Sequence, residues 1–352
     1  FIVIGVLLSP PIKNCNCVIL QNVCLSLVYL SLVLTISLHF YLSIFVSSYM
    51  DDIFGGYRDD NVRDQAATSL VDTLALGSMT IKAVTKSGLP PPADVTADGE
   101  SVGVVGYKWC SESDTMGLDI KPLTLGKSKR GTPAAPVEGD IAEALKPKFT
   151  KRVVAGRVAS VYDPLGLVAP LTARLKLDMS EVCKAVSGWD DKVPGHMLET
   201  WVQNLVQIRL LSEIRVPRNV GSGIPGCQKF HLVVCTDASQ SIAAAVAYAR
   251  SDIGNGKFDC NLIMSKSKLV LKSTVPRAEL RAATLGASLA RVIRQNLGGM
   301  IQSEMFVTDS TIAMFWMHQD QRPLQLSVRN SVIEIRRLTE LQNWYHIPGT
   351  QN

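Results

Sequence analysis

The chain has 352 residues, which leaves room for about two domains, and 47% of them are hydrophobic, enough for a sizeable core. The formal net charge of +5 at pH 7 permits nucleic-acid binding but is too small to indicate it. The eight cysteines form no C-x-x-C pair and no Cys/His spacing typical of zinc, which excludes the usual zinc modules and favours a reducing compartment.

The first 48 residues differ from the rest of the chain. They contain no Asp or Glu, and Lys13 is their only Lys or Arg. Residues 18–46 are uncharged and rich in Leu, Val, Ile and Ser over a length that can span a bilayer, for which about 20 apolar residues suffice. One interpretation is a transmembrane helix and a membrane protein. The other is that the stretch is not a natural protein segment and the protein is cytoplasmic; hydropathy alone does not separate the two.

The string Tyr49-Met50-Asp51-Asp52-Ile53-Phe54-Gly55-Gly56 follows this segment. Two adjacent Asp between apolar residues, then a Gly pair, predict a β-hairpin with the acids at its tip. The apolar positions of residues 66–84 predict a helix, and the Gly- and Pro-rich residues 88–92 predict a break after it. Residues 102–109 predict a strand, and residues 127–136 form a basic linker that contains Pro.

The middle of the chain is best explained by structure rather than by catalysis. Asp163-Pro164-Leu165-Gly166 has the residues that a type I turn favours at its first, second and fourth positions, and this accounts for Asp163. Apolar residues at helical spacing over residues 197–212 predict a helix that faces a core. The Gly- and Pro-rich residues 217–226 then mark a boundary.

Three short acidic motifs in the C-terminal third carry the strongest functional signal: Thr236-Asp237-Ala238-Ser239, Arg277-Ala278-Glu279-Leu280 and Thr308-Asp309-Ser310-Thr311. Asp237 and Asp309 each follow a short apolar strand, and Glu279 falls in the first turn of a helix that Pro276 begins. Carboxylates from separate elements suit hard divalent cations, and a pair of such ions can clamp a phosphodiester. The structural alternative is that the two Asp cap helices and Glu279 serves the helix dipole.

Taken together, these residues resemble the Pao/BEL family of long-terminal-repeat retrotransposon polyproteins. The order strand with Asp, two strands, helix with Glu and strand with Asp resembles ribonuclease H. The Tyr49–Asp52 string resembles the metal-binding hairpin of a reverse-transcriptase palm. Further matching strings are Gly106-Tyr107-Lys108-Trp109, residues 161–170, Gly188-Trp189-Asp190-Asp191, Val216-Pro217-Arg218 and Trp344-Tyr345-His346-Ile347-Pro348-Gly349. The resemblance extends over roughly residues 49–352.

The resemblance implies a mixed α/β fold in four parts. Residues 1–48 are the hydrophobic segment, 49–125 a palm remnant, 126–226 a helical connection identified as the Pao retrotransposon peptidase family, and 227–352 a truncated ribonuclease H-like domain with a mixed sheet. Asp237, Glu279 and Asp309 would be catalytic and would hold Mg²⁺ or Mn²⁺, while Asp51 and Asp52 would hold the polymerase metals. The partner in the intact parent would be an RNA–DNA hybrid or a nucleic-acid template, with no small-molecule cofactor.

The departures from the family matter for activity. No acid precedes Asp51 to supply the further palm ligand, and no Asp-Thr-Gly or Asp-Ser-Gly occurs, so an aspartic peptidase is not expected. The family's ribonuclease H part continues with Asn-Pro-Ala-Asp, of which Asn352 is the first residue. We therefore expect a polyprotein fragment that is inactive as it stands or cleaves RNA only slowly, with His346 structural. The alternative is a non-catalytic, membrane-tethered protein derived from the element, with vestigial acidic sites.

Overall fold

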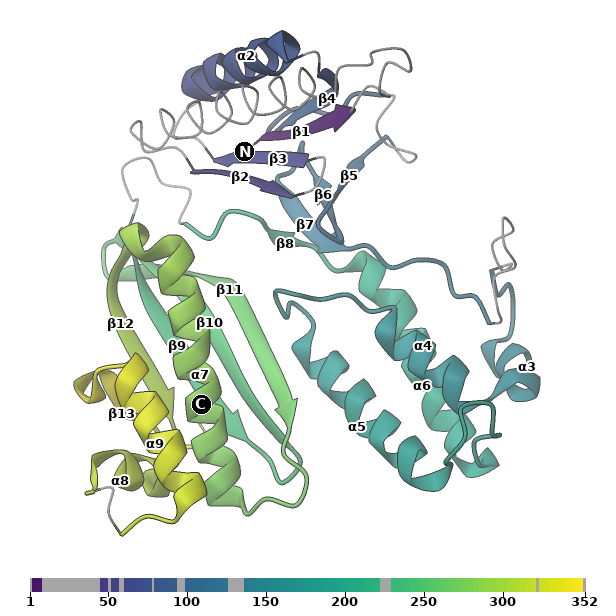
Figure 1. Cartoon of the computed structure of the whole chain (residues 1–352), viewed down its shortest axis with the longest axis vertical. Coiled ribbons are helices and arrows are strands. Elements are labelled where there is room, and N and C mark those ends of the chain that lie inside the picture. Colours follow the sequence, from purple (N-terminus) through teal and green to yellow (C-terminus); the bar gives the residue numbers. More distant parts are fainter. Residues whose placement is uncertain are drawn as a thin grey trace, which may run out of the picture. The chain divides into compact units, whose positions relative to one another are not determined.

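A computed structural model describes residues 2–7, 45–49, 52–56, 60–77, 79–93, 99–125, 136–221, 229–320 and 323–350 (Figure 1). Of residues 2–7 and 45–49, and of Asp52 and Thr80, it describes the backbone only. The chain divides into two compact units, Phe1–Gly117 and Leu118–Asn352. Each unit has its own helical structure, strands and buried core.

The first unit contains a four-stranded sheet in the order β2-β3-β1-β4. Its strands are β1 (Ile2–Leu7), β2 (Phe45–Tyr49), β3 (Asp52–Gly56) and β4 (Thr80–Lys86). Because β2 and β3 pair antiparallel with Tyr49 opposite Asp52, the predicted hairpin is confirmed. Asp51 lies outside the described residues, so the metal site predicted for Asp51 and Asp52 stays a prediction.

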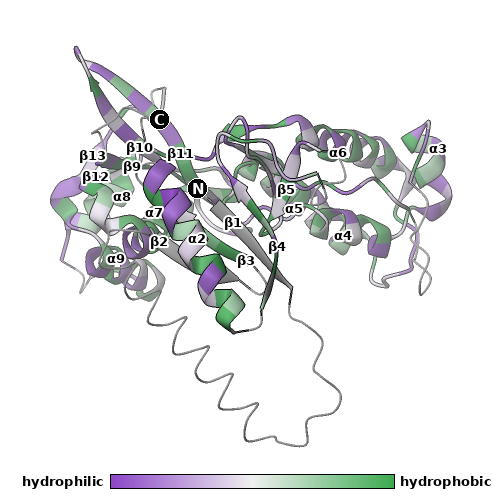
Figure 2. Ribbon diagram, turned by 90° about the horizontal axis from the view of Figure 1, so that it is seen from above, coloured by the Kyte–Doolittle hydropathy of each residue, from purple (hydrophilic) through white to green (hydrophobic). Residues whose placement is uncertain are grey.

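One helix, α2 (Asp60–Leu76), packs on this sheet through Ala67, Leu70 and Leu74. Hydrophilic and hydrophobic residues are both visible along α2 in Figure 2. The helix predicted over residues 66–84 is wrong beyond Leu76, because β4 begins at Thr80. Gly77 terminates the helix with a hydrogen bond from its N–H to the carbonyl of Leu74, and the β-branched residues that follow favour a strand.

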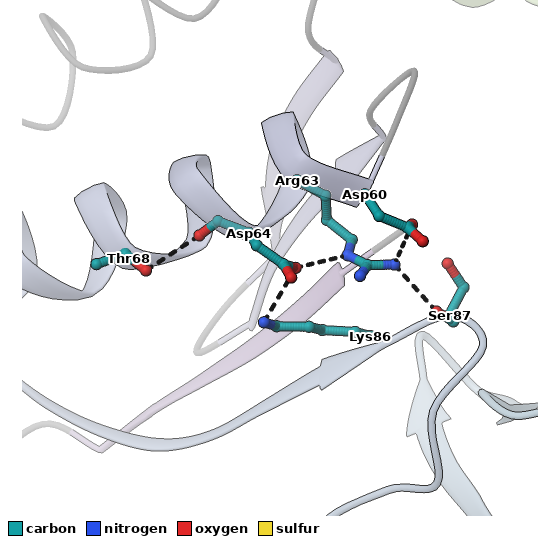
Figure 3. Close-up of polar contacts among 6 residues, drawn as sticks. All are labelled: Asp60, Arg63, Asp64, Thr68, Lys86 and Ser87. Carbon is teal, nitrogen blue, oxygen red and sulfur yellow. Dashed lines mark hydrogen bonds and ion pairs between the residues drawn. The ribbon is translucent and has the colours of Figure 1, made fainter.

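Arg63 joins the start of α2 to the end of β4 (Figure 3). The Arg63 side chain is 7% exposed; its Nη1 lies 2.7 Å from Asp60 Oδ1 and 3.1 Å from the Ser87 carbonyl oxygen, and its Nε lies 2.9 Å from Asp64 Oδ1. Lys86 Nζ lies 3.0 Å from the same Asp64 oxygen. Hydrogen bonds from Arg63 and Lys86 hold the pKa of Asp64 below its usual value.

Replacing Arg63 by methionine should destabilise the protein by about 1–3 kcal/mol, since a buried network loses its charged donor while the apolar stem is kept. Lys86→Met is the matched control, because it removes only a more exposed cation that contacts one of the same carboxylates. Urea unfolding of both variants provides the measurement. Equal losses of unfolding free energy in the two variants would show that the buried Arg63 guanidinium contributes no more to stability than the more exposed Lys86.

The rest of the first unit is a small sheet in which β5 (Ser101–Val104), β6 (Tyr107–Cys110) and β7 (Thr115–Leu118) are neighbours in that order. The strand predicted over residues 102–109 is two strands. Val105 and Gly106 take φ values of 47° and 83° and turn the chain between them, as a two-residue hairpin loop requires. Trp109 is fully buried, and its Nε1 donates to Asp114 Oδ1 at 3.0 Å.

Within the part of the chain that the structure describes, no helix combines the length and the apolar character needed to cross a membrane. Phe45 and Val46, the end of the predicted transmembrane segment, belong to strand β2. Residues 18–44 lie outside the described residues.

The second unit begins with a group of helices around Leu175, Val182, Trp201 and Leu205. Its α-helices are α3 (Ile141–Leu145), α4 (Lys151–Ala159), α5 (Ala169–Ala185) and α6 (Leu198–Leu210). The 3₁₀ turns η1 (Lys146–Lys148), η2 (Gly195–Met197) and η3 (Leu211–Glu213) and the short strand β8 (Val216–Pro217) complete this part. The helix predicted over residues 197–212 is therefore confirmed as α6 and the first residues of η3.

The turn at Asp163 is structural, as predicted. The N–H of Gly166 donates to the Asp163 carbonyl at 3.2 Å, and the Asp163 carboxylate accepts from the N–H groups of Leu167 and Val168. Gly166 has a φ of +73°, and a Cβ there would lie 2.1 Å from the carbonyl oxygen of Ser265. Only glycine therefore lets this turn lie against Ser265, whose N–H donates to the Leu165 carbonyl.

A five-stranded sheet in the order β11-β10-β9-β12-β13 dominates the rest of the unit. Its strands are β9 (Phe230–Ala238), β10 (Ile242–Gly254), β11 (Lys257–Leu269), β12 (Ile301–Thr308) and β13 (Trp344–His346). β9, β10 and β11 are antiparallel, whereas β12 runs parallel to β9 and β13 parallel to β12. The predicted mixed α/β architecture is confirmed and is consistent with a ribonuclease H-like fold.

The long helix α7 (Val275–Leu297) lies on one face of this sheet (Figure 1). Leu232, Val234 and Phe306 of the sheet pack with α7 and α9 in one core. Gly286 allows a close approach, since a Cβ there would lie 2.5 Å from Thr236 Cγ2. The remaining elements are η4 (Gly298–Met300), α8 (Thr311–His318), α9 (Leu326–Leu338) and η5 (Leu341–Asn343).

Candidate metal centre

Asp237 lies near the end of β9. Leu232, Val234 and Thr236 alternate with it and are buried, while Asp237 is exposed. Thr236 Oγ1 donates to the Val307 carbonyl at 3.0 Å and so ties the end of β9 to β12. The chain continues into strand β10 and not into a helix, so the alternative role of Asp237 as a helix cap is wrong.

Asp309 follows the last residue of β12. In the parallel register Thr308 lies opposite Thr236, so the next residues, Asp309 and Asp237, emerge at the same level of the sheet. The cap of α8 is Ser310, whose Oγ accepts from the N–H of Ala313 at 3.1 Å. The alternative role of Asp309 as the helix cap is therefore wrong as well.

Glu279 reaches the same place from α7. The helix begins at Val275, after the cap residue Thr274, so Glu279 is its fifth residue and not a first-turn acid as predicted. Glu279 is only 7% exposed, and its Oε2 has no hydrogen-bond partner among the described residues. A buried, unpartnered carboxylate oxygen is costly, which makes a role in the helix dipole a poor explanation for this residue.

The three carboxylates form one cluster. One oxygen of each of Asp237, Glu279 and Asp309 lies within 4.8 Å of the other two. Burial first, and then the charges of Asp237 and Asp309, raise the pKa of Glu279 to about 7, although a hydrogen bond from the Ala238 N–H lowers it in part. An all-oxygen set of acids that repel each other, with one buried lone pair unused, fits a hard divalent cation.

The segment after β13 lies against the third acid. His346 Nε2 is 3.1 Å from the Asp309 carbonyl oxygen, and the N–H of Ile347 donates to the Thr308 carbonyl at 3.1 Å. A Cβ at Gly349 would lie 2.7 Å from Asp309 Oδ2. The Trp344–Gly349 string contains no signal that Gly349 lies beside an acid.

Sequence comparison agrees with this geometry. Residues 150–310 match the family model described as Pao retrotransposon-like RNaseH-like domain. The match covers just under half of the chain, includes all three acids, and also includes α4, α5 and α6. No curated protein gives a match to the chain. Residues 150–310 thus carry an RNase H-like segment similar to that of Pao retrotransposons.

Proposed function

We propose that Asp237, Glu279 and Asp309 hold Mg²⁺ or Mn²⁺, and that the second unit is a nuclease module acting on the RNA strand of RNA–DNA hybrids. The observation that carries this proposal is the convergence of three carboxylates within 4.8 Å, one of them buried with an unpartnered oxygen. The family match supports a retrotransposon origin and a nucleic-acid partner. In the parent polyprotein the module would degrade RNA after it has been copied.

The three acids differ in burial, and we infer different roles for them. Asp237 is exposed and would meet the substrate side, whereas Glu279 forms the buried floor of the site. When bound, a divalent ion supplies Lewis-acid stabilisation of the phosphodiester and lowers the pKa of a coordinated water. The Thr236–Val307 hydrogen bond and the close approach of α7 at Gly286 hold the three acids in register.

Cleavage by this chain should be slow. Hydrolysis by two metal ions needs ligands for both. The cluster among the described residues contains three acids, so a second metal ion would share its ligands with the first.

We also propose that the first unit is a reverse-transcriptase palm remnant without polymerase activity. The β2–β3 hairpin supports this, and β1, the strand beside β3, carries no acidic residue that could complete a metal site.

The test is cleavage of a labelled RNA–DNA hybrid in Mn²⁺ at high protein concentration. We expect slow cleavage of the RNA strand alone, reduced by about 100-fold or more in Asp237→Asn, because even partners outside the ligand shell cost 10- to 100-fold. Glu199→Gln, which removes an exposed carboxylate from α6, is the control and should match the parent. Cleavage that survives Asp237→Asn would point to a contaminating nuclease and contradict the proposal.

A further inference from the structure

A cavity of about 280 Å³ lies among the helices of the second unit and contains none of the three acids of the metal centre. Helices α4 and α6 contribute to its wall, together with residues 120–123 and 136–137. These two segments are joined by a hydrogen bond from the N–H of Val137 to the Leu123 carbonyl at 2.7 Å. Leu205 and Ile208, both buried, give the cavity an apolar side.

The charged residues that line the cavity are all cations. They are Lys121, Arg157 and Arg209, and the lining includes no Asp or Glu. Lys121 forms an ion pair with Asp119. Within the described parts of the chain, the guanidinium groups of Arg157 and Arg209 have no hydrogen bond or ion pair. Two arginines without an anionic partner therefore line a concave site.

Arg157 is the more informative of the two because it is half-buried. Its burial lowers the pKa of the guanidinium, and no neighbouring acid offsets that effect. Half-buried arginines are ordinarily stabilised by a carboxylate or a phosphate, since the planar fork suits bidentate anions. Arg157 is thus a cation that has lost hydration without gaining a counter-charge from the residues that the structure describes.

We propose that this cavity binds a phosphate ester, with the phosphate at Arg157 and Arg209 and the attached organic group against Leu205 and Ile208. The volume lies just below the roughly 300–1,000 Å³ usual for ligand pockets, which suits one phosphate with part of a sugar. A free nucleotide and the backbone of a nucleic-acid strand both carry this chemistry. The inference does not depend on the metal centre.

The experiment measures binding of inorganic phosphate, a nucleoside monophosphate and a short single-stranded oligonucleotide to the full chain in EDTA, which removes any contribution of divalent ions. The variants are Arg157→Gln and Arg209→Gln. The matched control is Arg152→Gln, which removes the same charge from the same helix, where Arg152 forms an exposed pair with Asp190. We expect the two cavity variants to weaken nucleotide binding by about 10-fold or more, the range for losing a hydrogen bond to a charged group, and the control to bind like the parent.

Thermal unfolding distinguishes a loss of ligand binding from misfolding of the variant. Without ligand, Arg157→Gln should unfold at the same temperature as the parent or higher, because the lost cation has no partner among the described residues. The variant should lose the stabilisation that the nucleotide gives. Tighter binding of the oligonucleotide than of the monophosphate would identify a strand as the source, and the reverse order a free nucleotide. Equal binding by the parent and Arg157→Gln, or equal weakening in Arg152→Gln, would overturn the proposal.

Discussion

Glutamine at position 279 should make the metal-free protein more stable above neutral pH and remove its stabilisation by Mg²⁺. The pKa of Glu279 is raised from its ordinary value to about 7, first by burial and then by Asp237 and Asp309. Between about pH 4.5 and 7 the folded state therefore keeps a proton that the unfolded state releases, and stability falls as pH rises through this window. The loss by about pH 8 is on the order of 3 kcal/mol, because each unit of pKa corresponds to about 1.4 kcal/mol.

Denaturant unfolding in EDTA at about pH 5 and pH 8 checks this expectation. Glu279→Gln should match the parent at the lower pH, where Glu279 is protonated, and exceed it at the higher pH. Glu199→Gln removes an exposed carboxylate and should retain the pH dependence of the parent. Saturating Mg²⁺ should then stabilise the parent and leave Glu279→Gln unchanged. If the unfolding free energies of Glu279→Gln and the parent depended on pH in the same way, the pKa of Glu279 would not be raised in the folded protein.

Alanine at position 349 should weaken the metal site without unfolding the domain. The Gly349 backbone lies outside the left-handed region, so alanine fits its conformation, but the added Cβ would lie 2.7 Å from Asp309 Oδ2. The Asp309 carboxylate must then move. We expect a loss of metal affinity of about 10- to 100-fold, the range found when groups that orient metal ligands are changed.

Gly299→Ala is the matched control for this substitution, since a Cβ at Gly299 has no atom within 4 Å and its backbone also lies outside the left-handed region. Thermal unfolding without metal should be nearly unchanged in both variants. Metal affinity, measured by calorimetry, should fall in Gly349→Ala alone. A parent-like affinity in Gly349→Ala would mean that Asp309 is not needed in its observed position.

The order of motifs predicted the convergence of the three acids, because acids at the ends of neighbouring strands and near the start of a helix can meet at one edge of the sheet. Asp237 is the penultimate residue of β9 and Asp309 directly follows β12, and two parallel neighbours in register bring such ends together. Periodicity also predicted α6, and the residue types of Asp163–Gly166 predicted the turn there. It failed at residues 80–84, where apolar spacing suited both a helix and a strand and the break at Gly77 decided the outcome.

The supporting features could not be predicted from local patterns. Gly286 and Gly349 matter for the atoms that a Cβ would meet, Thr236 Cγ2 and Asp309 Oδ2, and these belong to distant parts of the sequence. Glu279 gained its raised pKa from burial under tertiary packing, which a position in a helix does not reveal. Likewise, Arg157 has no acidic partner among the described residues because of where the fold places their acids, and local sequence does not reveal this.

Titration of Mn²⁺ into the chain, followed by the loss of the free-ion electron paramagnetic resonance signal, shows whether the three carboxylates form a metal site. We expect a saturable site in the parent chain that Mg²⁺ competes for. The site should be lost in Asp309→Asn and kept in Glu199→Gln, because only the first substitution touches the carboxylate cluster. Mn²⁺ binding of equal affinity in the parent and Asp309→Asn would contradict a metal centre formed by Asp237, Glu279 and Asp309.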